Sequence, residues 1–276
     1  MRRLLRNPAG LILPLLGFLL VFYLLPVALM LGRSAGKEAD FAPYLAVFTS
    51  EVAIKVFLYT LRVAIFSTLI TLLLAYPLAY YIATTTERRA MILLAVVLVP
   101  FWTSILIRSY AWMVLLGQRG VINGFLGWIG IIDQPVRMLN TPFAVYIGMV
   151  HVLLPFMVLP ILGALKAIDG RLVAAAENLG AGPGSVFRHV ILPLSMPGVL
   201  AGSVLVFVLA LGFYITPALV GGPRDMTISM LIAQEVDLLR WDVASALATV
   251  LLLATLAALL AVSRVLSLDR IMGKAK

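Results

Sequence analysis

The sequence contains no cysteine, only two histidines and few charged residues. The absence of cysteine excludes disulfides, iron–sulfur clusters and thiolate metal sites. His151 and His189 are far apart in the sequence, so an imidazole metal site is not expected either. Charged residues make up 12% of the 276 residues, whereas a soluble domain has about 25%. A soluble fold of this composition would leave much apolar surface in water.

Apolar residues are abundant instead, at 63% of the chain, and the mean hydropathy is +1.10. A membrane-spanning helix needs about 20 mostly apolar residues. Six charge-poor stretches meet this length, and the third contains Arg108: residues 11–31, 63–85, 90–116, 139–165, 198–220 and 243–263. The first is longer than the apolar region of a signal peptide, so we expect it to be retained. The sequence therefore predicts an all-α polytopic membrane protein with six transmembrane helices.

The distribution of charge predicts the orientation of these spans. The net charge of +9 would suggest nucleic acid on a soluble chain, but lysine and arginine gather on the cytoplasmic side of membrane proteins. With the N-terminus inside, nearly all of the positive excess lies inside, and the outside segments are balanced. We therefore expect both termini in the cytoplasm and a single transmembrane domain over residues 1–276. Its largest polar interruptions are an outside loop at about 33–60 and a cytoplasmic loop at about 167–197.

The cytoplasmic loop carries the most informative pattern. Residues 172–179 are rich in alanine and predict a short helix, with Gly180 where a helix commonly stops. Ser185 is placed to cap a second short helix over residues 186–190. Two prolines are expected to break the chain before the fifth span: Pro193 and Pro197. The result would be a helical hairpin on the cytoplasmic face, which could dock a partner or lie against lipid headgroups as an interfacial hairpin.

The loop resembles the EAA loop of permeases of ATP-binding cassette importers. The matching residues keep a fixed spacing over about 25 positions: Ala175, Ala176, Leu179, Gly180, Ala181, Phe187, Leu192, Pro193, Leu194, Pro197 and Gly198. Ala174 stands where the family has its glutamate, and Glu177 follows three residues later. The resemblance implies a coupling helix that docks into a cleft of an ATPase subunit. The residues it implies for this contact are Ala175, Ala176, Glu177, Leu179, Gly180, Phe187 and Arg188.

Two further segments are similar to the spermidine/putrescine type of these permeases. Residues 100–112 read PFWTSILIRSYAW, like the third-span signature, and residues 212–223 read GFYITPALVGGP, like the end of the fifth span. The resemblance implies a type I importer permease fold in the bacterial inner (cytoplasmic) membrane. It implies half of a translocation pathway working by alternating access. It also implies a polyamine substrate and three kinds of partner: a second, sister permease subunit, two ATPase copies and an external solute-binding protein.

The sequence lacks a phosphate-binding loop of the form GxxxxGK[ST]. Its two Gly-Lys pairs, Gly36-Lys37 and Gly273-Lys274, are followed by Glu38 and Ala275 and do not fit. No plausible catalytic set is present. We therefore expect a non-catalytic subunit without a cofactor of its own, with ATP and magnesium on a partner ATPase.

Several polar or aromatic residues within the spans are candidates for the translocation pathway: Trp102, Arg108, Tyr110, Tyr214 and Thr216. An ionisable residue in a span is costly and usually faces a cavity or a partner. The alternatives are that Arg108 snorkels outward and that the aromatic residues form an interfacial belt. His151 is expected to be a packing residue. The outside segment 224–242 has an acidic excess that could guide a cation or dock a binding protein, or be a solvated loop.

Three other functions stay open on the sequence alone. The substrate could be an amino-acid-like compound or an organic anion, because the spans hold no carboxylate that would argue for a cation. A secondary transporter or channel would need no ATPase, but paired acids inside the spans would be expected and are absent. A structural membrane protein would not need the loop pattern.

Overall fold

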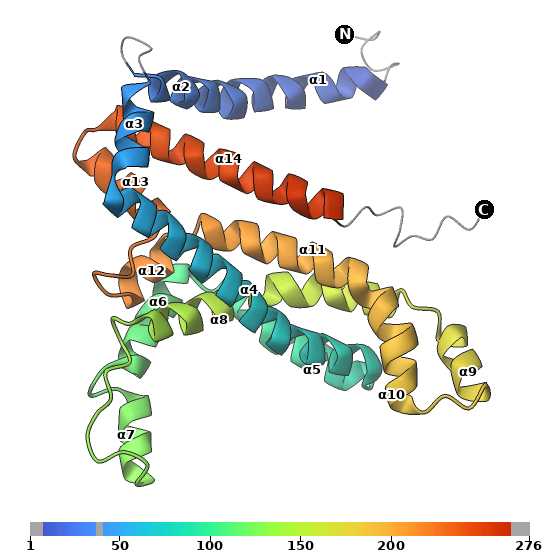
Figure 1. Ribbon diagram of the computed structural model, residues 1–276. Helices are drawn as coiled ribbons and strands as arrows, with labels where there is room; N and C mark the ends of the chain where they lie inside the picture. The colour runs from blue at the N-terminus through green and yellow to red at the C-terminus, as the bar shows by residue number, and fades with distance from the viewer. Residues whose placement is uncertain (1–7, 37–40, 266–276) are drawn as a thin grey trace. The chain divides into compact units, whose positions relative to one another are not determined.

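The structure is a computed structural model that describes residues 8–36 and 41–265, and all regular secondary structure in these ranges is helical (Figure 1). Five helices are long and apolar enough to cross a membrane, and one bent pair of helices would provide a sixth span. The all-α fold with six spans is thus consistent with the sequence prediction. The chain divides into two compact units, one of residues 1–55 with 231–254 and one of residues 56–230 with 255–276.

The first unit contains the N-terminal span and the segment predicted as an outside loop. The span is one helical run made of α1 (Pro8–Leu19), the π-helical turn η1 (Leu20–Leu24) and α2 (Leu25–Ser34). The unit also contains α3 (Ala42–Thr49), the start of α4 (Glu51–Thr84), most of α13 (Ile228–Asp237) and the start of α14 (Trp241–Val265). The Ser34 hydroxyl lies 2.7 Å from the Tyr44 hydroxyl. Arg240 Nε lies 3.0 Å from Glu235 Oε2. This ion pair uses part of the acidic excess of the segment 224–242.

The predicted loop at 33–60 is largely helical, so this prediction was wrong. Ser50 begins α4 by accepting a hydrogen bond from the Ala53 N–H at 3.3 Å, and Glu51 and Lys55 pair one turn apart. Charged residues ended the span in the sequence interpretation, but Glu51 and Lys55 pair on the first turns of the helix instead, after the Ser50 cap. With 34 residues, α4 is about 50 Å long, and the hydrocarbon core is only about 30 Å thick. The helix therefore extends beyond the apolar layer.

The second unit holds the remaining spans and the helical hairpin that the sequence predicts on the cytoplasmic face. Its elements in chain order are the rest of α4, α5 (Glu87–Trp102), α6 (Ile105–Leu116), α7 (Val121–Trp128), α8 (Pro142–Lys166), α9 (Gly170–Asn178), α10 (Pro183–Val186), η2 (Phe187–Ile191), α11 (Leu192–Leu211), α12 (Ile215–Val220) and the end of α14. The fourth and sixth predicted spans correspond to α8 and α14.

Helices α8 and α11 form the closest packing of this unit, and two glycines make it possible. A Cβ atom on Gly198 would lie 2.5 Å from both the Ala164 Cβ and the Pro160 carbonyl oxygen. A Cβ on Gly202, one turn later, would lie 2.9 Å from the Met157 Sδ. Small residues four apart let two membrane helices approach to backbone contact, where van der Waals packing and not water drives association. The backbone of α11 therefore lies directly on α8.

The third predicted span is not one straight helix. The segments Glu87–Trp102 and Ile105–Trp128 meet at 101°, and the break between them lies at Thr103 and Ser104, where the Thr103 backbone is extended. Pro100 lies in the last turn of α5, and the Thr103 hydroxyl donates to the Pro100 carbonyl at 2.9 Å. A side-chain hydroxyl that binds a local carbonyl competes with helix continuation. Arg108 consequently lies on a second helix after the bend, and not deep within a continuous span.

The fifth predicted span begins earlier and ends earlier than expected. One helical run extends from Pro183 to Leu211, and α12 is separate from it. The predicted breaks at Pro193 and Pro197 do not occur, and the run bends between α10 and α11 (Figure 1). In a membrane protein, local π turns and neighbouring helices can satisfy the carbonyls that a proline frees. Ser185 lies inside α10, whose N-cap is Gly182, so the predicted cap was also wrong.

Substituting Gly198 tests the α8–α11 contact. Gly198→Leu should destabilise the folded protein by about 1–3 kcal/mol or more, because the new side chain has no space against Ala164 and Pro160. The measurement is thermal unfolding of purified protein in mild detergent. Gly163→Leu is the control, since a Cβ on Gly163 of the neighbouring helix α8 meets no atom within 4 Å. Equal melting temperatures for the two variants would contradict this packing.

Candidate functional site

The first helix of the hairpin has defined ends. Asp169 caps α9 by accepting a hydrogen bond from the Arg171 N–H at 2.9 Å. At the other end Gly180 has a φ of +85°, a conformation that favours glycine. The Gly180 N–H donates to the Glu177 carbonyl at 2.9 Å, and the Ala181 N–H donates to the Ala176 carbonyl at 3.1 Å. This pair of bonds is a Schellman motif, so the predicted helix stop at Gly180 has a physical cause.

Helix α9 buries none of its residues within the described part of the chain. Ala175 and Glu177 are exposed, and Ala176 is half-buried. Leu172 is 49% exposed, and Leu179, directly after the helix, is 89% exposed. The helix thus presents small side chains beside two uncovered leucines. A surface of this kind can fit closely against a partner, because the alanines leave its backbone accessible.

The second arm of the hairpin is attached to α4. The Phe187 ring stands edge-on to the rings of Tyr76 and Tyr80, with centroids 6.0 and 5.5 Å apart. The Tyr76 hydroxyl lies 2.9 Å from the Ser195 hydroxyl at the start of α11. Of the predicted coupling residues, Phe187 therefore contacts its own chain, and Arg188 is exposed. Sequence reasoning missed Tyr76 and Tyr80, although two tyrosines one turn apart near the end of a predicted span could have indicated them.

The five predicted pathway residues occupy different environments. Trp102, Tyr110 and Tyr214 are 86%, 55% and 46% exposed. Arg108 is half-buried, and its buried Nε has no hydrogen-bond partner among the described residues. The Thr216 side chain is only 1% exposed, so it packs inside the unit. The exposed aromatic side chains and the guanidinium group remain free for contacts outside this chain.

Thr216 joins three helices. A Cβ on Gly148 of α8 would lie 2.5 Å from the Thr216 Cγ2, so α12 sits directly on α8. The Thr216 hydroxyl lies 3.3 Å from the Ser109 hydroxyl of α6. Nearby on α8, His151 Nδ1 accepts a hydrogen bond from Trp112 Nε1–H at 3.1 Å. This bond gives the His151 Nδ1 atom a hydrogen-bond partner inside the unit, as expected of a histidine that packs between helices.

A buried carboxylate connects the turn after α12 to α4. Asp225 is only 4% exposed; its Oδ1 accepts from the Tyr59 hydroxyl at 3.0 Å and its Oδ2 from the Gly222 N–H at 2.8 Å. The Ile228 N–H donates to the Thr60 hydroxyl at 2.8 Å. The sequence interpretation took Asp225 as part of an exposed acidic segment. The structure shows that this acid holds the turn in place instead.

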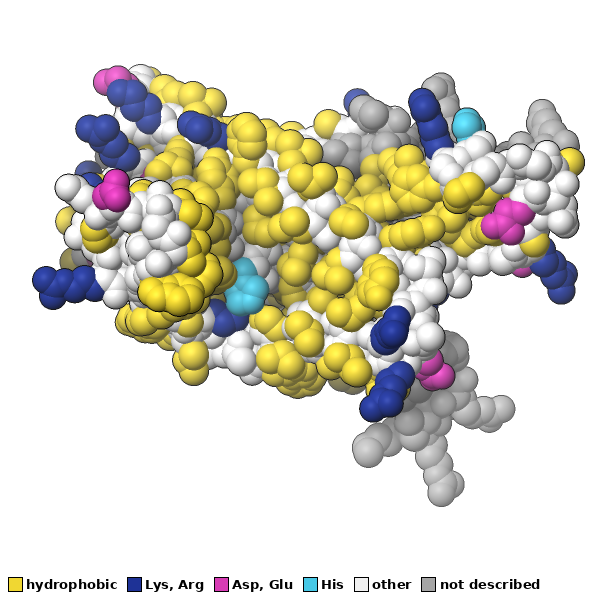
Figure 2. Space-filling model, turned by 90° about the horizontal axis from the view of Figure 1, so that it is seen from below, with side chains coloured by type: hydrophobic (Ala, Val, Ile, Leu, Met, Phe, Trp, Pro, Cys, Tyr) yellow, Lys and Arg dark blue, Asp and Glu magenta, His cyan; other side chains and the backbone are white. Residues whose placement is uncertain are grey.

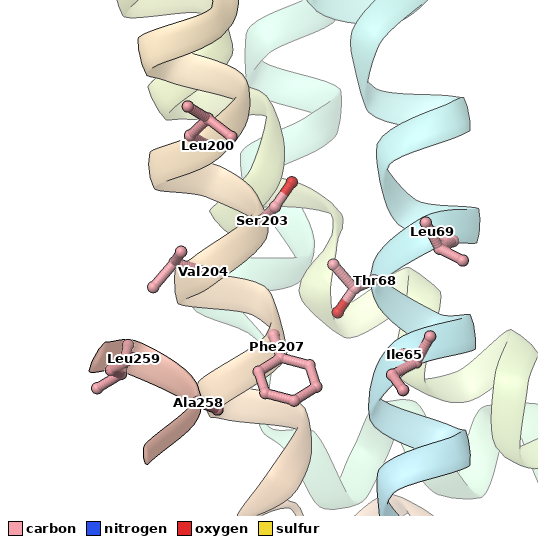
Figure 3. A pocket seen from close by; sticks show the side chains of 9 residues that line it. All are labelled: Ile65, Thr68, Leu69, Leu200, Ser203, Val204, Phe207, Ala258 and Leu259. Atoms are coloured by element: carbon pink, nitrogen blue, oxygen red, sulfur yellow. The ribbon is translucent and has the colours of Figure 1, made fainter. Parts of the chain in front are cut away.

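A groove of about 270 Å³ runs between α4, α11 and the end of α14 (Figure 3). Its lining residues are Ile65, Thr68, Leu69, Leu200, Ser203, Val204, Phe207, Ala258 and Leu259. The Thr68 hydroxyl donates to the Ala64 carbonyl at 2.7 Å, so it is already satisfied. No charged side chain lines the groove, and none of the predicted pathway residues belongs to it. The groove suits an apolar occupant and not an ionic substrate.

Apolar side chains also cover much of the surface, as the face shown in Figure 2 illustrates. Exposed examples include Leu73 on α4 at 74%, Val96 on α5 at 64% and Leu260 on α14 at 62%. A soluble monomer rarely exposes apolar patches of this extent. The exposed residues lie on the same helices that are long enough to span a bilayer. Lipid or a second protein chain must therefore cover them.

The sequence matches one protein family over residues 11–272, the family described as "Binding-protein-dependent transport system inner membrane component". Among curated proteins it is similar to the spermidine/putrescine transport system permease protein PotB of Escherichia coli strain K12. The two are 36% identical over 244 residues, which cover 85% of this chain and 89% of that protein. A probable molybdenum ABC transporter permease protein of Haloferax volcanii is 31% identical over 223 residues, covering 80% and 77%.

Among solved structures, the fold resembles a chain of a bacterial alginate ABC transporter in complex with an alginate pentasaccharide-bound periplasmic protein. The TM-score is 0.79 at 22% sequence identity, and the match covers 96% of this chain and 94% of that chain. At this identity the likeness establishes the fold alone. With the family match and the 36% identical relative, the chain belongs to the binding-protein-dependent transport system inner membrane component family, as a multi-pass permease subunit of an ABC importer in the bacterial inner membrane.

Proposed function

We propose that this chain is a single permease domain over residues 1–276 that forms half of a polyamine pathway, coupled through residues 167–197 to a separate ATPase. Both termini would lie in the cytoplasm, as the positive-inside rule predicts. The single observation that carries the proposal is the uncovered face of α9 on a hairpin anchored to the spans. An exposed helix with one uncovered leucine near its start and another directly after its end would serve as a docking surface, and the Phe187 contacts tie the hairpin to α4.

The predicted coupling residues include some on the exposed face of α9 and one, Phe187, that contacts α4. Ala175, Glu177 and Leu179 are exposed and would contact the partner. Phe187 faces α4 and would pass the movement of the hairpin to the spans. Closure of the ATP-bound partner would draw the hairpins together and open the pathway outward, and reopening after hydrolysis would release the substrate inward. Such coupling links two distant sites through a change of state that both of them bias.

The proposal requires three kinds of partner: an ATPase, a binding protein and a second permease subunit. The sequence has no phosphate-binding loop, so ATP and magnesium would bind to two copies of an ATPase subunit. The family description names a binding protein, which would deliver the substrate from outside. The groove between α4, α11 and the end of α14 has no charged lining, and we place the ionic pathway against a second permease subunit. The exposed residues Trp102, Tyr110 and Tyr214 are available for that surface.

A polyamine is the proposed substrate because the 36% identical relative is named for spermidine and putrescine. The exposed aromatic rings suit such a substrate, since an ammonium group is attracted to an aromatic face by about 0.5–2 kcal/mol. Arg108 would repel a cation at close range, so it is expected to border the pathway or to pair with the second subunit. Another small solute is the alternative, as the molybdenum relative illustrates.

Uptake by the reconstituted transporter tests the substrate. The chain is assembled with its sister permease, ATPase and binding protein in proteoliposomes, and ATP-dependent entry of labelled spermidine is measured. We expect uptake that unlabelled putrescine reduces and that molybdate leaves unchanged. If molybdate or an amino acid is taken up and spermidine is not, the substrate assignment fails, but the permease assignment stands. Loss of all ATP dependence would contradict the importer mechanism itself.

Replacement of Gly180 tests the coupling role of the hairpin. Gly180→Leu should abolish transport and leave membrane insertion intact, because a side chain at a φ of +85° costs roughly 1–2 kcal/mol and undoes the Schellman motif. Uptake and the stimulation of ATP hydrolysis by the binding protein are measured together. Gly184→Leu is the control, since Gly184 lies in the same hairpin without a positive φ. Normal uptake and stimulation in Gly180→Leu would refute the coupling assignment.

A further inference from the structure

The helical run from Pro183 to Leu211 contains one π-helical turn, η2, at Phe187–Ile191. The Leu192 N–H donates to the Phe187 carbonyl five residues back, where an α-helix would use four. A single π turn in an α-helix accommodates one additional residue, and such turns are frequent at functional sites. This turn lies in the second arm of the hairpin, directly before α11, and Pro193 is the second residue of α11.

The additional residue has a geometric consequence. Phe187 and Ser195 are eight residues apart, and both contact Tyr76, one through its ring and the other through its hydroxyl. In a regular α-helix each residue turns by about 100°, so eight residues would place these side chains about 80° apart. Seven residues would place them within about 20° of the same direction. The π turn therefore lets Phe187 and Ser195, which are eight residues apart, point in nearly the same direction, as residues seven apart do in an α-helix.

The two sides of the turn are held by different contacts. Downstream, α11 lies on α8 through Gly198 and Gly202, so its rotation is fixed. Upstream, the Phe187 ring reaches Tyr76 and Tyr80 on α4. The Tyr76 side chain contacts both sides of the turn, Phe187 upstream and Ser195 downstream.

We propose that Tyr76 and the π turn form a joint that moves α4 and α11 together when the hairpin moves. Tyr76 is a positioning residue in this proposal, since it acts through the hairpin and touches neither nucleotide nor substrate. The proposal rests on the coupling function above and deepens it. It states that the phase between Phe187 and Ser195, and not the identity of the residues between them, is what transport requires.

A spacing series tests the phase. Deleting Val190 leaves seven residues, which an α-helix keeps in phase, so transport should stay within about twofold of wild type. Deleting His189 and Val190 together leaves six residues and turns Phe187 about 120° away, so uptake should fall at least tenfold. The control is the double substitution His189→Ala/Val190→Ala, which keeps all eight residues and should transport normally. Circular dichroism and detergent extraction confirm that each variant is folded and inserted.

A second pair of variants tests Tyr76 itself. Tyr76→Phe keeps the ring contact with Phe187 and loses the hydroxyl contact with Ser195, and Tyr76→Ala loses both. The readout is the number of ATP molecules hydrolysed for each substrate molecule transported, which a merely structural role would not change. We expect this ratio to rise several-fold in Tyr76→Ala and to return toward wild type in Tyr76→Phe.

A cross-link between positions 80 and 187 reports whether these two positions stay close together, and it needs no transport assay. The protein has no native cysteine, so Tyr80→Cys and Phe187→Cys give one pair of thiols at positions whose rings are 5.5 Å apart. A short bifunctional maleimide should link them at spacings of eight and seven, but not at six. Equal loss of uptake at spacings of seven and six, or an unchanged cross-link at six, would overturn the proposed joint. If wild-type uptake proves independent of ATP, the coupling function fails, and the cross-link still decides the geometry.

Discussion

The contact between α8 and α11 is the interaction on which the rest of this structure depends. Gly198 and Gly202 remove the side chains that would keep the two backbones apart. The hairpin is the chain segment between these two helices, so both of its ends are fixed to one packed pair. In a bilayer such packing must come from shape, because lipid provides no hydrophobic force between helices. A bulky residue at either glycine would loosen the base from which the hairpin extends.

From this base the hairpin shows two different faces. The Phe187 side is packed against α4 by aromatic contacts, each worth about 0.5–1.5 kcal/mol beyond the area that it buries. The α9 side is left uncovered, with Leu179 almost fully exposed. A segment fixed on one side and open on the other can transmit a displacement from a partner to the spans. The exposed aromatic and apolar side chains elsewhere on the chain are likewise available for contact with lipid or a second subunit.

Periodicity and charge predicted the parts of the fold that depend on composition. Long apolar runs predicted α8 and α14, and Gly180 predicted the end of α9, because a positive φ strongly favours glycine. The bend after α5 and the continuity through Pro193 were not predictable in this way. Both depend on which backbone carbonyls find hydrogen-bond partners in local side chains and turns. The pattern of apolar residues does not indicate these partners. The exposure of α9 followed from the hairpin pattern, but the inward direction of Phe187 depends on tyrosines more than 100 residues away.

The central claim is that the open face of α9 lies in the cytoplasm and docks onto an ATPase. Because the native sequence has no cysteine, Ala175→Cys provides a single reporter on that face. The decisive measurement is its labelling by a membrane-impermeant maleimide in oriented vesicles, with and without the ATPase subunit. The account predicts labelling in inside-out vesicles only, and protection when the ATPase is bound. Labelling from the periplasmic side, or equal labelling with and without the ATPase, would contradict it.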